Sequence, residues 1–156
     1  SYIHAEGKIC VLVDFETDLV NDEIKEMAKN IAMQITAMKP VYTNDSEVDE
    51  EYKAHELEII KSQIENDPKM AGKPEKVING AIMGRLNKQL KEICLLDQVY
   101  VIAEDGKQSV AAYVAQVAKA NGANVAVKGF VRFETGEGME KKNEDFAAEV
   151  AAQLGK

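Results

Sequence analysis

The sequence has few of the residues from which metal sites and disulfide frameworks are built. Its 156 residues include only two cysteines, Cys10 and Cys94, and two histidines, His4 and His55. No cysteine or histidine has a partner at the spacing of a zinc site, so we expect no bound metal. Each cysteine lies in an apolar run, which predicts a buried, unreactive thiol, with a disulfide or reactive thiol as the alternative.

Long apolar runs and an excess of basic residues are also missing. No run approaches the roughly 18 apolar residues that a membrane span requires, and no signal-like segment opens the chain, so we expect no membrane partner. The 19 basic residues are outnumbered by 27 acidic ones, which gives a net charge of −8. Such a surface repels phosphate backbones, so we expect no nucleic-acid partner. It does fit docking to a basic face of another protein.

Catalytic arrangements are equally absent. Ser46, Ser62 and Ser109 fit helix caps or helix surfaces, and no Ser-His-Asp or Cys-His order is present. The segment Gly136–Gly138 lacks the lysine of a phosphate-binding loop, and the acidic segment 45–51 lacks the spacing of a calcium loop. We therefore expect no cofactor and no bond chemistry. An enzyme with a scattered carboxylate site is the remaining alternative.

The first forty residues predict a β-hairpin followed by a helix. A hairpin is expected over Tyr2–Glu16, with Gly7 in its turn and with Ile9–Val13 apolar on both faces, as in a covered strand. Asp22 is the expected helix cap, and Pro40 ends the helix. One apolar stripe follows at helical spacing: Ile24, Met27, Ala28, Ile31, Ile35 and Met38.

The middle of the chain predicts an antiparallel helical hairpin over residues 46–94. Ser46 and Asp49 open its first helix as a near capping box, and Pro68 interrupts the helical pattern. Pro74 restarts a second, more apolar helix. The first helix has only a thin apolar stripe, so we expect part of the hairpin to project from the core as an arm.

The last third predicts two strands and two helices. A short strand is expected over Gln98–Ala103, a helix over Ser109–Asn121 and a long strand over Asn124–Thr135 that buries Val131. Gly136 and Gly138 then turn the chain into a helical module over residues 139–156. Together these patterns indicate one α+β domain over residues 1–156, with a small, about three-stranded sheet covered by helices on one face.

Several ordered segments resemble the elongation factor Ts family of bacterial translation factors. The matching segments are Ser1–His4, Ile9–Val13, Ile31–Pro40 with Tyr42, Lys73–Pro74, Gly84–Leu86 with Lys88, Gly129–Lys141 and Asp145–Ala152. The resemblance implies an antiparallel sheet packed on helices with a protruding helical hairpin. It also implies a bacterial, cytoplasmic protein that binds elongation factor Tu and promotes release of GDP as an exchange factor.

The resemblance carries site residues over unevenly. The family motif Thr-Asp-Phe-Val, whose aromatic residue wedges into elongation factor Tu, stands here as Thr17–Val20, with Leu19 in the aromatic place. The resemblance implies that the family's N-terminal helical domain and its first subdomain have no counterpart in this sequence. A C-terminal half of the factor is therefore implied, and its contacts would be His4 together with Phe146, Glu149 and Val150.

The sequence leaves three alternatives open. In a single-subdomain factor, Asp18 and Leu19 would do the wedging themselves, whereas Leu19 could instead be packed inside the domain. The chain could also be a homodimerisation or interaction fragment without exchange activity, because the family's core is a dimerisation domain.

Overall fold

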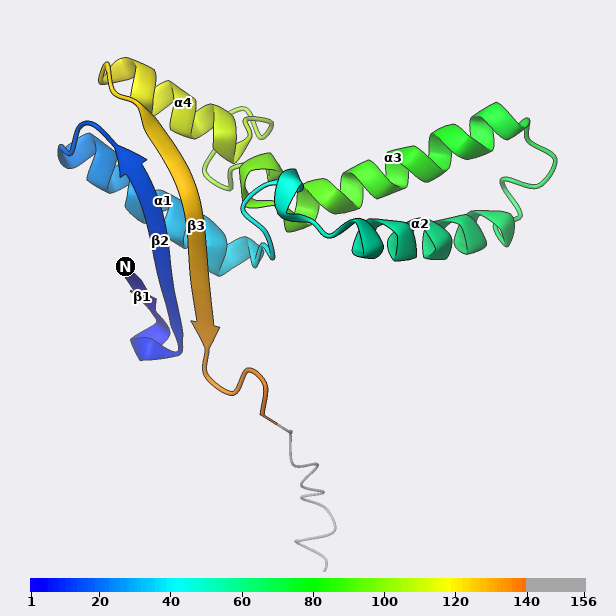
Figure 1. Cartoon of the computed structure of the whole chain (residues 1–156), viewed down its shortest axis with the longest axis horizontal. Coiled ribbons are helices and arrows are strands. Elements are labelled where there is room, and N and C mark those ends of the chain that lie inside the picture. Colours follow the sequence, from blue (N-terminus) through cyan, green and yellow to red (C-terminus); the bar gives the residue numbers. More distant parts are fainter. Residues whose placement is uncertain (140–156) are drawn as a thin grey trace, which may run out of the picture.

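The computed structural model describes residues 1–139, which form a three-stranded antiparallel sheet, two helices packed on it and a projecting helical hairpin (Figure 1). The strands are β1 (Tyr2–His4), β2 (Ile9–Thr17) and β3 (Val125–Glu134), in the order β1-β2-β3. The helices are α1 (Asp22–Met38), α2 (Glu50–Glu65), α3 (Glu75–Ile93) and α4 (Val110–Ala120), with single turns η1 (Ala5–Gly7), η2 (Asp45–Glu47) and η3 (Leu95–Asp97). The predicted α+β class is confirmed.

The β1–β2 hairpin and the long strand β3 form as the sequence predicts. The turn of the hairpin contains Ala5, Glu6 and Gly7, which all have positive φ. The φ of Gly7 is 91°, which glycine adopts without the steric cost that a side chain brings. Strand β3 pairs with the whole of β2, from Ile9 opposite Glu134 to the far end, with one irregularity between Asp14 and Phe15.

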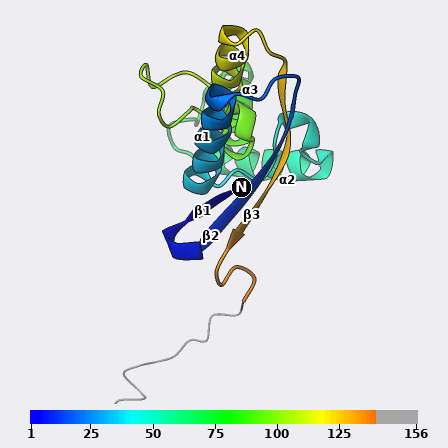
Figure 2. The ribbon, with the colours of Figure 1, turned by 90° about the vertical axis from the view of Figure 1, so that its left-hand side faces the viewer.

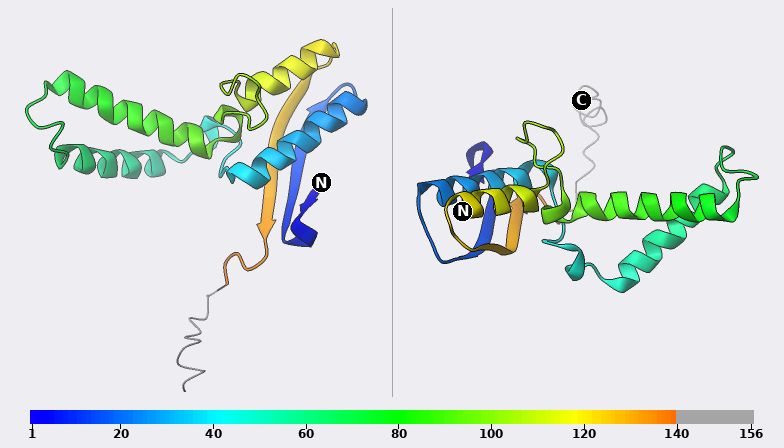
Figure 3. Two further views of the ribbon diagram at one scale, coloured as in Figure 1. Left: turned by 180° about the vertical axis from the view of Figure 1, so that it is seen from behind. Right: turned by 90° about the horizontal axis from the view of Figure 1, so that it is seen from above.

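Helix α1 supplies much of the main core. Its predicted stripe is correct at Ile24, Met27, Ile31 and Ile35, which are all buried against the sheet and α4. The cap lies one residue earlier than expected, because the side chain of Asn21 accepts a hydrogen bond from the backbone N–H of Ile24. Figure 3, left, shows α1 and α4 in front of the strands, so both helices cover the same face of the sheet.

The opposite face of the sheet carries exposed apolar side chains. Ile3 is 67% exposed, Phe133 is 60% exposed, and Leu12 and Val131 are each about half exposed. The strand register places all four on one face, called here the open sheet face. One-sided covering is thus confirmed. The predictions of a strand covered on both faces and of a buried Val131 are wrong, because no described helix packs there.

Helices α2 and α3 form the predicted antiparallel hairpin, which projects from the sheet domain (Figures 1 and 3). The hairpin has its own small apolar cluster, built on Ile60, Ile64, Ile82 and Leu86. Its first helix is capped by Asp49 rather than by Ser46, which lies in the turn η2.

The segment Gln98–Ala103 does not form the predicted strand. Its backbone is instead satisfied by a fully buried side chain of α1: the Gln34 amide accepts from the N–H of Val101 (2.9 Å) and donates to the carbonyl of Val99 (3.0 Å). Tyr100 donates its N–H to Gln108 at 2.8 Å, which closes the loop on itself. The alternation of buried and exposed residues is strand-like, but the segment forms only one isolated antiparallel bridge, between Val99 and Ser109, and no strand.

The predicted module over residues 139–156 lies outside the described residues, except for Met139. Within the described chain, no helix is both long and apolar enough to cross a membrane.

Candidate protein-binding site

The loop that follows β2 is held in one conformation by two sets of hydrogen bonds. The Thr17 hydroxyl donates to the carbonyl of Leu19 (2.9 Å) and accepts from the N–H of Leu19 (3.3 Å). The carboxylate of Asp18 accepts from both the backbone N–H (2.8 Å) and the side-chain amide (2.7 Å) of Asn124. These bonds tie the loop to the residue that precedes β3.

The hydrogen bonds from Asn124 favour the ionised form of Asp18. The backbone N–H and then the side-chain amide of Asn124 lower the pKa of this carboxyl below its ordinary value of 3.8. Both oxygens are engaged with Asn124, so the carboxylate serves first to fix the loop.

The other end of the loop is fixed by an asparagine pair. The Asn21 amide, which caps α1, donates to the side-chain oxygen of Asn121 at the end of α4 (2.7 Å). Asn121 in turn donates to the Glu23 carboxylate (2.8 Å). Between these anchors, Leu19 is 38% exposed and Val20 is 66% exposed. The alternative in which Leu19 is packed inside the domain is therefore wrong, and Val20 is the more exposed apolar residue.

A shallow groove lies beside this loop, between the end of β2, the start of β3 and helix α4. Its volume is about 700 Å³, and its lining consists of Glu16, Thr17, Asp18, Ala115, Ala118, Lys119, Ala123, Asn124, Val125 and Ala126. Small alanine side chains make up much of this lining, so another chain can approach closely. The loop and its groove can bind a surface, but they hold no enclosed chamber for a small substrate.

His4, the second predicted contact on the described chain, lies far from this loop. It sits on β1 opposite Ile9, at the start of β2, whereas Thr17 is at the end of β2. Eight strand residues separate the two positions by roughly 26 Å at about 3.3 Å per residue. His4 is exposed, and its Nδ1 is 3.1 Å from the Tyr2 hydroxyl. The structure does not bring His4 and Leu19 together.

The remaining predicted contacts, Phe146, Glu149 and Val150, lie outside the described residues. The sequence reasoning missed the parts played by Asn121 and Asn124. The pair Asn121–Gly122 indicated only a helix end, and nothing in the sequence signalled that Asn124 meets a carboxylate 106 positions earlier.

The described residues hold no candidate metal site, and one of the two thiols has a raised pKa. Within residues 1–139, no group of three or more His, Cys, Asp or Glu side chains is placed to hold a metal ion. Both cysteines are free thiols. Burial, and then the charge of Asp97, raise the pKa of the Cys94 thiol to about 11, so it stays protonated at neutral pH. Cys94 is buried as predicted, whereas Cys10 is only half-buried.

The family model that matches this chain and three similar proteins carry the same name. The sequence model described as "Elongation factor TS" matches residues 1–137. Elongation factor Ts of Clostridioides difficile strain 630 is 47% identical over 153 residues, which is 98% of this chain and 48% of that protein. The Clostridium acetobutylicum protein of the same name is 45% identical over 154 residues, 99% of this chain and 48% of the relative.

A third relative, elongation factor Ts of Clostridium botulinum strain Eklund 17B, is 44% identical over 156 residues, the whole of this chain and 50% of that protein. The chain thus spans about half the length of the curated relatives it matches. With the family model matching nearly all of the described residues, the chain belongs to the elongation factor Ts family.

Proposed function

We propose that this chain binds elongation factor Tu and promotes release of its GDP, as a guanine-nucleotide exchange factor or its C-terminal half. The observation that carries the proposal is the family match over residues 1–137. The chain would then act in translation, in the bacterial cytoplasm. Exchange of this kind requires no reacting group in the chain, because it depends only on the equilibrium between the nucleotide-free and GDP-bound forms of the partner.

The mechanism is differential affinity. A protein that binds nucleotide-free elongation factor Tu more tightly than the GDP-bound form lowers the affinity for GDP by the same factor. A fixed surface suits this task, since a loop that is already ordered loses little conformational entropy on binding. The Asp18–Asn124 hydrogen bonds and the Asn21–Asn121 pair supply that order.

In this proposal, Leu19 and Val20 make the apolar contact, while Asp18 positions them. His4 would contact a second region of the partner, roughly 26 Å away at about 3.3 Å per strand residue. Phe146, Glu149 and Val150 remain proposed contacts of the terminal segment. Leucine is smaller than the aromatic residue of the family motif, so we expect weaker wedging by this loop and exchange slower than that of a full-length factor.

The direct test mixes the chain with elongation factor Tu loaded with fluorescent GDP. Acceleration of nucleotide release that saturates with chain concentration would support the exchange role. Binding without acceleration would support the half-factor version. The absence of both binding and acceleration at high micromolar concentration would refute the proposal.

A matched pair of variants locates the contact. Val20→Ser should weaken binding, whereas Met83→Ser on α3, where the side chain is 50% exposed, should leave it unchanged. Equal loss in both variants would show that binding depends on general surface apolarity and not on the loop.

Self-association is a second candidate function, favoured by the open sheet face. Ile3, Leu12, Val131 and Phe133 form an apolar surface across all three strands. Two such faces can pack as a β-sandwich, about 10 Å apart. Sedimentation analysis of Phe133→Ser should then show dissociation of a dimer that forms at high micromolar concentration. A monomeric wild-type chain at that concentration would refute this candidate.

A further inference from the structure

One edge of the sheet has a stretch without a neighbouring strand. Strand β3 pairs with the whole of β2, from Ile9 to Thr17. On the other side of β2, strand β1 pairs only with Ile9, Cys10 and Val11. Figure 2 looks onto this side of the sheet, with β1 beside only the lower part of β2. The edge of β2 from Val13 to Thr17 is therefore open within the described residues, and it is called here the free edge.

The strand register shows which backbone groups face the free edge. The N–H of Thr135 donates to the carbonyl of Lys8 (2.8 Å), so the backbone groups of Lys8 point toward β3. Successive residues of a strand alternate between its two sides, so the N–H and C=O of Val13 and Phe15 point away from β3. In the part of the chain that the structure describes, these four groups have no backbone partner. A row of unpaired N–H and C=O groups is a template for another strand.

A trough runs along the free edge, between β2 and helix α1. Its volume is about 560 Å³, and its apolar lining includes the half-buried side chains of Val13, Phe15 and Ala28. Residues at alternate positions of a strand share one face. A strand added at the free edge can therefore bury apolar side chains in the trough if they stand at every second position.

The charged side chains that line the trough are both basic. Lys25 and Lys29 come from successive turns of α1, and both are exposed. Lys25 lies 3.7 Å from the exposed carboxylate of Asp22, and Lys29 forms no ion pair within residues 1–139. In a chain with a net charge of −8, this trough is a local basic site. It favours an occupant that carries a carboxylate.

A second copy of this chain fits the free edge poorly. Antiparallel pairing of two free edges about Phe15 places Asp14 of one copy opposite Glu16 of the other. Pairing about Asp14 or about Glu16 places identical carboxylates opposite each other. Like charges directly opposite destabilise a strand pair, so the free edge favours a different chain.

We propose that the free edge and its trough bind an extended peptide segment of another protein, with apolar residues at alternate positions and a carboxylate on the same face. Such a segment adds a strand to the sheet: it pairs with the backbone of Val13 and Phe15, and its carboxylate reaches Lys25 or Lys29. Peptide binding at this edge does not depend on the proposed function, because it requires neither the loop 17–20 nor nucleotide exchange.

The probe is the peptide acetyl-Thr-Val-Thr-Glu-Thr-Val-Thr-amide, which is titrated into the full chain at low salt and followed by NMR. The amides of Val13 and Phe15 should shift and should exchange their hydrogens more slowly in the complex. Only every second N–H of the peptide faces β2. N-methylation of one alternate set of peptide amides should therefore weaken binding at least about 10-fold, whereas N-methylation of the other set is tolerated.

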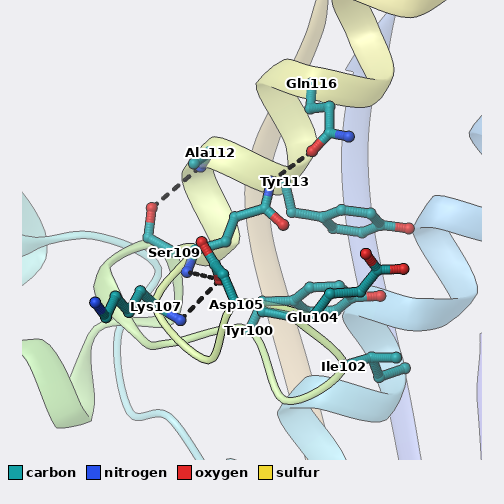
Figure 4. A pocket seen from close by; sticks show the side chains of 11 residues that line it. Tyr100, Ile102, Glu104, Asp105, Lys107, Ser109, Ala112, Tyr113 and Gln116 are labelled. Carbon is teal, nitrogen blue, oxygen red and sulfur yellow. Dashed lines mark hydrogen bonds between the residues drawn. The ribbon is translucent and has the colours of Figure 1, made fainter.

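A matched pair of charge reversals tests the basic rim. Lys29→Glu should weaken binding about 3-fold or more, through loss of an attraction and gain of a repulsion. The control is Lys107→Glu, which should leave binding unchanged. Lys107 lines a separate hollow beside the rings of Tyr100 and Tyr113 (Figure 4).

The unaltered chain gives the decisive readout, which does not depend on the folding of a variant. If the amides of Val13 and Phe15 neither shift nor slow at millimolar peptide, or if both N-methylated peptides bind equally well, the proposal is overturned and the proposed function is untouched. A full-length relative tests the other occupant. If the counterparts of these amides are already protected there and the peptide does not bind, the longer chain fills its own edge, which also overturns the proposal.

Discussion

Replacement of Gln34 by methionine should destabilise the protein through one buried amide group. The Gln34 side chain is completely buried and makes three hydrogen bonds: to the side-chain oxygen of Gln98 (3.1 Å), to the carbonyl of Val99 (3.0 Å) and from the N–H of Val101 (2.9 Å). Each such bond contributes about 0.5–1.5 kcal/mol net, so their joint loss should cost about 2–4 kcal/mol. Methionine has a similar length, which limits any additional cavity.

Urea denaturation measures this loss, and hydrogen exchange locates it. The amide of Val101 should lose its protection, whereas amides of the α2–α3 hairpin should keep theirs, because the hairpin has a separate apolar cluster. Gln116→Met is the control, since Gln116 is exposed on α4, and it should change stability by less than about 0.5 kcal/mol. A loss below about 1 kcal/mol for Gln34→Met, with the Val101 amide still protected, would refute the account of the loop as anchored by this residue.

Three further outcomes follow from burial and charge. Ile31→Ala, at a fully buried residue, should cost about 2–4 kcal/mol in urea denaturation, whereas Val131→Ala on the open sheet face should cost less than half as much; equal losses would contradict the one-sided sheet. The pKa of Asp18 is lowered in the folded chain, so this carboxylate contributes stability at pH values above its ordinary pKa of 3.8, and the contribution is lost as the pH falls below that value. Titration followed by NMR should show the lowered pKa, and Asp18→Asn should abolish the corresponding pH dependence of stability. At pH 8, a thiol reagent should label Cys10 well before Cys94, whose pKa is about 11. Mass spectrometry should show similar labelling of the two thiols only when the chain is unfolded, and equal labelling of the folded chain would refute the burial of Cys94.

The helical elements were predictable because their signals are local. The stripe of α1 repeats at helical spacing through Ile24, Ile31 and Ile35, and these residues are buried as the pattern requires. Pro74 marks the start of α3 in the same way, because its fixed φ suits a helix start. Such features depend on residues within a few positions of one another.

The segment Gln98–Ala103 shows where local signals fail. Its apolar alternation is typical of a strand, yet Gln34, more than 60 residues earlier, takes the backbone groups that a neighbouring strand would pair. The exposure of Val131 could not be predicted for the same reason. An apolar side chain is suited to burial, but the tertiary arrangement decides which face of a sheet is covered.

The loop that holds the candidate site could be located in the sequence, but the hydrogen bonds that fix it could not. The motif Thr17–Val20 could be located by its likeness to a family motif. That the Asp18 carboxylate bonds Asn124 depends on the meeting of two distant segments. The relative exposure of Leu19 and Val20 follows from that meeting, and no spacing in the sequence records it.

The distribution of apolar surface separates the proposed interactions in space. The open sheet face lies on the side of the sheet away from the helices α1 and α4, whereas the loop 17–20 lies at the end of β2. A second copy packed on the open sheet face would therefore leave the loop 17–20 free for another partner. Self-association and binding of elongation factor Tu are then compatible: occupation of one surface does not remove the other by steric overlap. Coupling between the two would pass along β2, which carries Leu12 of the open sheet face and ends at Thr17, the first residue of the loop.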